Sequence, residues 1–213
     1  MEPSQTNIDS KNPYAWTLAA TPNSKNANAL LKEANLSNNI EYGKNRAMLA
    51  WFNIDPLFTR ENSSLTPSHI KNDKDQLSDH FVREVNIREI YPNKDIAYNE
   101  SATIATLNLS YYPKERGPYN LNTLDMCADG KFITPKEKWG GITRKMDVRD
   151  FETENVEYIE FWLMDPCVNN NNPNYEKNNG GSLYINLGEI SEDVLKDGKK
   201  FFENGLPIND DPD

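Results

Sequence analysis

The chain has 213 residues, of which 37% are hydrophobic and 26% are charged, and its formal net charge is −10. A chain of this size can bury one sizeable core. The acidic balance repels phosphate backbones and argues against a nucleic-acid partner. The apolar runs are too short for a transmembrane helix. Asparagine occurs 29 times, which favours long ordered loops or reflects an AT-rich genome.

The first 42 residues are predicted to form an extended arm with a short helix. Residues 14–18 alternate in the manner of an extended segment, and apolar residues within 25–36 lie at helical spacing. Residues 1–5 have neither the basic nor the apolar part of a signal peptide. Residues 208–213 are polar and are expected to be a linker. We therefore expect the sequence to be an excised fragment.

Residues 43–100 are predicted to be a helix-containing segment that packs on the rest of the domain. Residues 46–54 form an apolar run that ends at a proline and predict a short buried segment. The main helix is expected over 75–91, with Asp75 as its N-cap and an ion pair between Glu84 and Arg88. A strand remains the alternative there, because the apolar residues fit neither period cleanly.

Residues 101–207 are predicted to form an antiparallel β-sandwich of jelly-roll type, so the fold class is mainly β with short helices. Strands are expected over 102–112, 156–164 and 182–187. The segment 156–164 is apolar on both faces, which indicates a central strand with Phe161 and Trp162 buried. Ser191 is expected to cap a short final helix that ends near Gly198.

No catalytic group is evident in the sequence. The two histidines, His69 and His80, have no partners at metal-binding spacing, and no nucleotide-binding or hydrolase motif occurs. Acidic residues within 150–160 offer no convincing acid–base pair. The asparagine-rich stretch 169–179 could supply calcium ligands but is more typical of a loop. We therefore expect no enzyme activity, no cofactor and no metal.

The two cysteines, Cys127 and Cys167, lie 40 positions apart and form no C-x-x-C motif. They are compatible with one disulfide in an oxidising compartment or with two separate thiols.

Four longer segments carry a more specific signal. They are Tyr42-Gly43-Lys44-Asn45-Arg46-Ala47 with Ile54-Asp55-Pro56-Leu57-Phe58; Tyr111-Tyr112-Pro113-Lys114-Glu115-Arg116-Gly117-Pro118-Tyr119-Asn120; Trp139-Gly140-Gly141-Ile142; and residues 158–166 with 180–195. Together these segments resemble the SprA/Sov family, the giant outer-membrane translocon of the Bacteroidetes type IX secretion system, which is also tied to gliding motility. The resemblance extends from about residue 14 to 207. Neither cysteine belongs to the family pattern.

The resemblance implies an internal piece of a much longer protein that exports folded cargo. Because 156–164 does not alternate as a barrel wall does, we expect a soluble structural domain on the periplasmic or extracellular side of the outer membrane. Its expected partners are the rest of the translocon barrel, its accessory subunits and the secreted cargo. A cell-surface carbohydrate-binding β-sandwich is the alternative. The residues expected to matter structurally are Arg116, Gly117, Pro118, Tyr119, Trp139, Phe161, Trp162, Asp165, Gly181 and Gly188.

Overall fold

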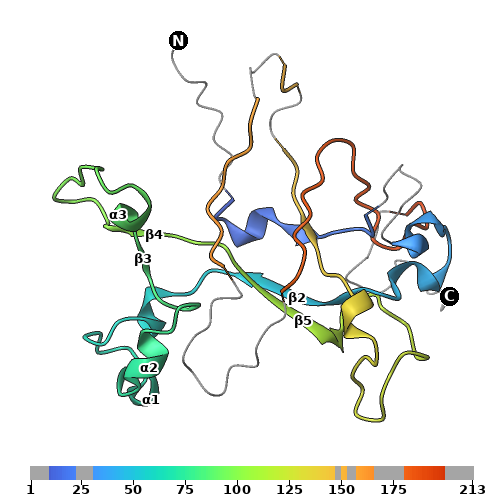
Figure 1. Ribbon diagram of the computed structural model, residues 1–213, viewed down its shortest axis with the longest axis horizontal. Coiled ribbons are helices and arrows are strands. Elements are labelled where there is room, and N and C mark those ends of the chain that lie inside the picture. The colour runs from blue at the N-terminus through green and yellow to red at the C-terminus, as the bar shows by residue number, and fades with distance from the viewer. Residues whose placement is uncertain (1–9, 23–30, 147–149, 153–156, 166–179, 200–213) are drawn as a thin grey trace. The chain divides into compact units, whose positions relative to one another are not determined.

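The computed structural model describes residues 10–22, 31–146, 150–152, 157–165 and 180–199 (Figure 1). In this part of the chain, small two-stranded sheets predominate and the helices are single turns. The strands are β1 (Thr17–Leu18), β2 (Ala47–Phe52), β3 (Val85–Asn86), β4 (Thr103–Ile104), β5 (Asn108–Arg116) and β6 (Ile142–Thr143). The α-helices are α1 (Ser68–Lys71), α2 (Lys74–Leu77) and α3 (Ile87–Ile90). No helix of the described residues has the length and apolar character needed to cross a membrane.

The chain divides into two compact units, each built from separate stretches of sequence. The first unit takes its described residues from 10–13, 52–108 and 146–184, and the second unit from 14–51, 109–145 and 185–199. The pairs β1–β6 and β3–β4 are antiparallel, and β2 pairs with β5. The expected mainly β class with short helices is therefore confirmed, whereas the described residues do not confirm a sandwich of two stacked sheets.

The first unit replaces the predicted helix over 75–91 with three short elements, α2, β3 and α3, so that prediction is wrong. The reason is local competition for backbone N–H groups. Asp73, not Asp75, caps α2 by accepting from the N–H of Gln76 at 3.0 Å. Asp79 accepts from the N–H of Phe81 at 2.9 Å. Short polar side chains that bind nearby backbone offer an alternative to a continuous helix.

Two further contacts in this segment follow from the break in the helix. Asn86 starts α3 with a capping box, in which Glu89 bonds back to the N–H of Asn86. The predicted ion pair of Glu84 with Arg88 does not form, because Glu84 pairs instead with Arg60 at 3.0 Å. Residues four positions apart share one face only in a continuous helix, and the chain between Glu84 and Arg88 is not one.

The second unit is organised around the start of β2. The N–H of Ala47 donates to the carbonyl of Trp139 at 2.7 Å, and the N–H of Gly117 donates to the carbonyl of Arg46 at 3.2 Å. The backbone of Arg46 and Ala47 is therefore hydrogen-bonded to two other segments of the chain. Arg46 is fully buried and Ala47 is 1% exposed. The predicted burial of 46–54 is confirmed only at the start of the segment, because Met48, Phe52 and Asn53 are exposed.

The segment 157–165 is not the buried central strand that its pattern predicts. It has no regular secondary structure, and Phe161 and Trp162 are 54% and 70% exposed. Within 157–164, no backbone or side-chain hydrogen bond to other described residues is formed. A strand that is apolar on both faces needs partner strands at its edges and cover on both sides. The described residues supply neither, so the prediction that these two side chains are buried is wrong.

Residues 182–187 also lack the predicted strand, and the predicted helix after Ser191 is replaced by a turn. The side chain of Asp193 accepts from the N–H groups of Lys196 and Gly198 at 2.7 and 2.8 Å. These bonds fold 193–198 around one carboxylate, and Gly198 adopts a φ of +77°. The hydroxyl of Ser191 still accepts from the N–H of Asp193 at 3.2 Å, so both polar side chains bind nearby backbone and a turn forms in place of the helix.

We expect Trp162→Ala to change the free energy of unfolding by less than about 1 kcal/mol, because exposed side chains contribute little to stability. If Trp162 were buried in a central strand, its replacement would instead lower the free energy of unfolding by about 3–5 kcal/mol. Urea unfolding of the parent and the variant measures the difference. A loss of several kcal/mol would contradict the exposed position of Trp162.

Two features named from the sequence fall outside the described residues. Cys127 is exposed, but its potential partner Cys167 is not described, so the disulfide stays a prediction. The asparagine-rich loop 169–179 also lies outside the described residues, and with it the question of calcium binding.

Candidate functional site

Arg46, directly before β2, has the largest fully buried side chain among the residues that the structure describes. One terminal nitrogen donates to the carbonyl of Pro118 at 3.2 Å, and the other donates to the carbonyls of Ala19 and Val194 at 3.5 and 3.2 Å. The guanidinium also lies over the ring of Trp139, 5.2 Å from the centroid. A buried charge is tolerated only when it is paired or well hydrogen-bonded. Here backbone carbonyls and an aromatic face surround the cation.

Close backbone contacts fix this arrangement. A Cβ on Gly117 would run into the carbonyl of Ala47, and a Cβ on Gly43 would run into the carbonyl of Tyr119. Asn120 is 2% exposed, and its side-chain amide donates to the carbonyl of Arg46 at 2.6 Å. Glycine is needed at both positions because any side chain would force the segments apart.

Segments that are far apart in sequence therefore meet around Arg46. The turn after β5 (116–120), the segment 139–141 and the turn 193–198 all contact the start of β2 or the Arg46 side chain. Parts of all four segments that carry the resemblance meet here, namely 42–47, 116–120, 139–141 and 193–195. The arrangement is a junction of backbone segments around one buried cation.

A second polar cluster in the same unit surrounds Lys138, whose side chain is 1% exposed. Its Nζ lies 2.5 Å from Oδ2 of Asp125 and donates to Oδ1 of Asn45 at 2.9 Å. The Nζ also lies 4.6 Å from the centroid of the Phe132 ring. The hydroxyl of Thr134 donates to the same carboxylate oxygen at 2.5 Å. The cluster thus joins an amine, a carboxylate and an amide under one aromatic ring.

These contacts alter the acidity of Asp125. The hydrogen bond from Lys138, followed by the one from Thr134, lowers the pKa of the Asp125 carboxyl below its ordinary value. Both donors stabilise the ionised form. In the resting state Asp125 is therefore a carboxylate that faces the Lys138 amine.

Tyr111 on β5 provides a test of pH dependence. Its hydroxyl donates to the carbonyl of Lys138 at 2.7 Å, and burial raises its pKa to about 12. Because the folded-state pKa lies above the ordinary value near 10, the stabilisation is complete below about pH 10 and is lost as the pH rises through about 12.

We expect one tyrosine to titrate near pH 12 in the folded protein, as measured by the ultraviolet absorbance of tyrosinate. The Tyr111→Phe variant should lack this step, whereas Tyr98→Phe, which removes a fully exposed hydroxyl, should retain it. A high-pH step that persists in Tyr111→Phe would contradict the assignment.

Some of the residues selected from the sequence lie at the Arg46 junction, and the others are exposed to solvent. Gly117 is buried, the carbonyl of Pro118 binds Arg46, Tyr119 adopts a φ of +56°, and Trp139 lies beside the guanidinium. Arg116 ends β5 and is exposed. The remaining selected residues, which do not join the junction, are Phe161, Trp162, Asp165, Gly181 and Gly188, all exposed.

The sequence interpretation did not select the residues that organise the two clusters. Arg46 and Asn45 lie in the first quoted segment, but nothing local indicates which of its residues is buried. Lys138 directly precedes the third segment, and Asp125 lies outside all four segments. A lysine next to a tryptophan in an acidic chain is the one signal that could have found the second cluster.

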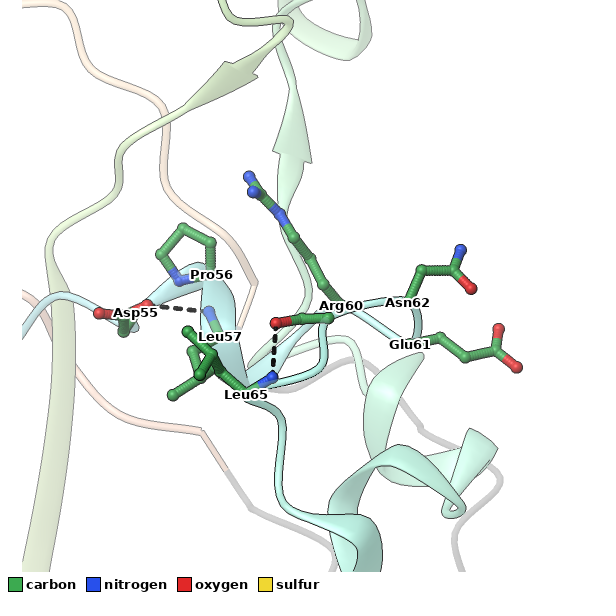
Figure 2. Close-up of a pocket in the computed structure, with 8 residues that line it drawn as sticks. Asp55, Pro56, Leu57, Arg60, Glu61, Asn62 and Leu65 are labelled. Atoms are coloured by element: carbon green, nitrogen blue, oxygen red, sulfur yellow. Dashed lines mark hydrogen bonds between the residues drawn. The ribbon is translucent and has the colours of Figure 1, made fainter.

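A shallow depression in the first unit lies over the turn that follows β2 (Figure 2). In it Asp55 accepts from the N–H of Leu57 at 2.8 Å, and the side chains of Glu61 and Asn62 extend away from Leu57. The carboxylate is therefore used as a cap. Within the described residues no group of three or more metal-binding side chains occurs.

Comparison with known proteins adds no assignment. No known family model matches the chain, and no curated protein matches it.

Proposed function

We propose that this protein is a structural and interaction domain of an outer-membrane protein-secretion translocon, where it supports the export of folded cargo proteins. The observation that carries the proposal is the convergence around Arg46 of the segments that resemble the translocon family. Arg46 and Val194, which lie 148 positions apart in the sequence, meet at one junction of glycines, carbonyls and a buried cation. Such a junction holds backbone geometry and performs no chemistry.

A second observation supports an interaction role. The segment 157–164 exposes Tyr158, Phe161, Trp162 and Leu163 and makes no hydrogen bond to other described residues. Contiguous exposed apolar surface marks interaction sites. An extended segment with unpaired edges is suited to joining another sheet by strand addition. We propose that the translocon supplies that sheet and that 156–164 completes a β-sandwich there.

The exposure of Tyr158 and Trp162 also favours a second candidate, a carbohydrate-binding module. Exposed aromatic rings provide apolar faces on which sugar rings can stack. Binding to immobilised polysaccharides, lost in Trp162→Ala, would favour this candidate over the translocon domain.

The experiment replaces Arg116-Gly117-Pro118-Tyr119 by a Gly/Ser stretch in the intact translocon. We expect less cargo in the medium, because the carbonyl that binds Arg46 and the tight Gly117 contact are disturbed. The same replacement at the exposed residues 128–131 is the matched control. The abundance of the translocon in the outer membrane is measured alongside.

A second variant separates interaction from folding. Trp162→Ala should leave the junction intact and still reduce cargo export, whereas Tyr98→Ala, at another fully exposed aromatic, should not. Normal export from cells with the 116–119 replacement, or turnover of a polysaccharide by the purified protein, would overturn the proposal.

A further inference from the structure

We propose that Lys138 and Asn45 become joined by an intramolecular isopeptide bond, with Asp125 as the proton-transfer group. Where the three side chains meet, the Lys138 amine is almost inaccessible to solvent, because its side chain is only 1% exposed. The amine lies 2.9 Å from Oδ1 of Asn45 and 2.5 Å from Oδ2 of Asp125. A lysine amine is a competent nucleophile when a neighbouring base takes its proton.

The backbone holds the two reacting residues next to each other. The N–H of Trp139 donates to the carbonyl of Asn45 at 3.0 Å, and Trp139 directly follows Lys138. Arg46 and Trp139 also form a parallel bridge. Such positioning turns attack between two side chains into an effectively unimolecular step.

The third group is placed just as firmly. The carbonyl of Asp125 accepts from the N–H of Ile133 at 3.3 Å, and its carboxylate accepts from the Thr134 hydroxyl. The ring of Phe132 covers the amine. Because the Lys138 side chain is 1% exposed, little water reaches the amine to compete with it as a nucleophile.

The chemistry needs no further reactant. Lys138 passes one proton to Asp125, and the neutral Nζ then attacks Cγ of Asn45. The new bond joins Nζ to Cγ, and the bond between Cγ and Nδ2 breaks. Asp125 gives its proton to the departing Nδ2, which leaves as ammonia, and accepts the second proton that Nζ loses. The products are one amide, one molecule of ammonia and a protonated Asp125.

The bond would tie together residues 93 positions apart in sequence. A covalent link of that kind limits how far the unfolded chain can expand, and it therefore resists mechanical and thermal unfolding. The same three side chains without the reaction would be an ordinary buried ion pair, and the mass of the protein separates the two states.

The test is the intact mass of the purified full chain under denaturing conditions. We expect a mass about 17 Da below that of the sequence, equal to the loss of ammonia. Trypsin should release a branched peptide in which residues 45–46 are joined to 137–144, because cleavage after a modified Lys138 is blocked. The full sequence mass with normal cleavage after Lys138 would overturn the proposal.

Variants test the assigned roles. Lys138→Arg and Asn45→Ala should each have full mass, and Asp125→Ala should also have full mass although both joined groups remain. Asp129→Ala, at an exposed carboxylate of the same turn, should still show the loss of ammonia. Should Asp125→Ala fail to fold, the mass of the parent still decides. A loss of about 18 Da, with Asp125 itself in the branched peptide, would overturn the assignment of Asn45.

Discussion

Replacing Arg46 by Ala is expected to destabilise the second unit by about 3–5 kcal/mol, most of the stability of a small domain. The variant removes the donors to the carbonyls of Pro118, Ala19 and Val194, of which the last two belong to buried residues. It also leaves a cavity beside Trp139. Each unsatisfied buried acceptor costs about 1–3 kcal/mol.

Urea unfolding followed by tryptophan fluorescence measures this loss. Arg46→Lys should recover only part of it, because one ammonium cannot reach three carbonyls in the geometry of the guanidinium. Arg60→Ala is the control, since its ion pair with Glu84 is largely exposed and is worth less than about 1 kcal/mol. Equal stabilities of Arg46→Ala and Arg60→Ala would disprove the role of Arg46 as the centre of the junction.

Gly117→Ala is expected to cost at least about 2 kcal/mol, because its Cβ would lie closer to the carbonyl of Ala47 than side chains come. The backbone cannot yield easily, since the N–H of Gly117 is bonded to the carbonyl of Arg46. The added methyl group therefore separates the turn after β5 from the start of β2.

Gly181→Ala provides the matched control, because a Cβ there meets nothing within 4 Å and its φ is not in the left-handed region. This substitution should leave the melting temperature within a degree or two of the parent. The idea of a close backbone approach at Gly117 fails if both alanine variants melt at the same temperature as the parent.

The local sequence supported a partly correct prediction where the pattern of apolar residues lies within one segment. The apolar run before Asp55-Pro56 predicted a buried segment, and the structure buries its first two residues, Arg46 and Ala47, whereas Met48 and Phe52 are exposed. It was insufficient where short polar side chains compete for backbone N–H groups. Asp79 and Asn86 divide the region expected to be one long helix, and apolar periodicity carries no information about that competition.

The candidate site depended on contacts that no local pattern contains. The partners of Arg46 lie 72, 27 and 148 positions away along the chain. Conversely, 156–164 had a strong pattern for a buried strand, but burial requires partners as well as apolar side chains. In the described residues nothing covers Phe161 and Trp162, so the apolar pattern did not produce a buried strand there.

By itself the sequence determined the mainly β class with short helices and the net negative charge, because these follow from local spacing and from composition. Only the tertiary structure decided that Arg46 is fully buried, that Lys138, Asp125 and Asn45 meet, and that Trp162 faces solvent. The physical reason is that burial and hydrogen bonding belong to pairs of segments. The free-energy cost of removing a side chain from water is offset only by the carbonyls, rings and strands that the folded chain brings into contact with it.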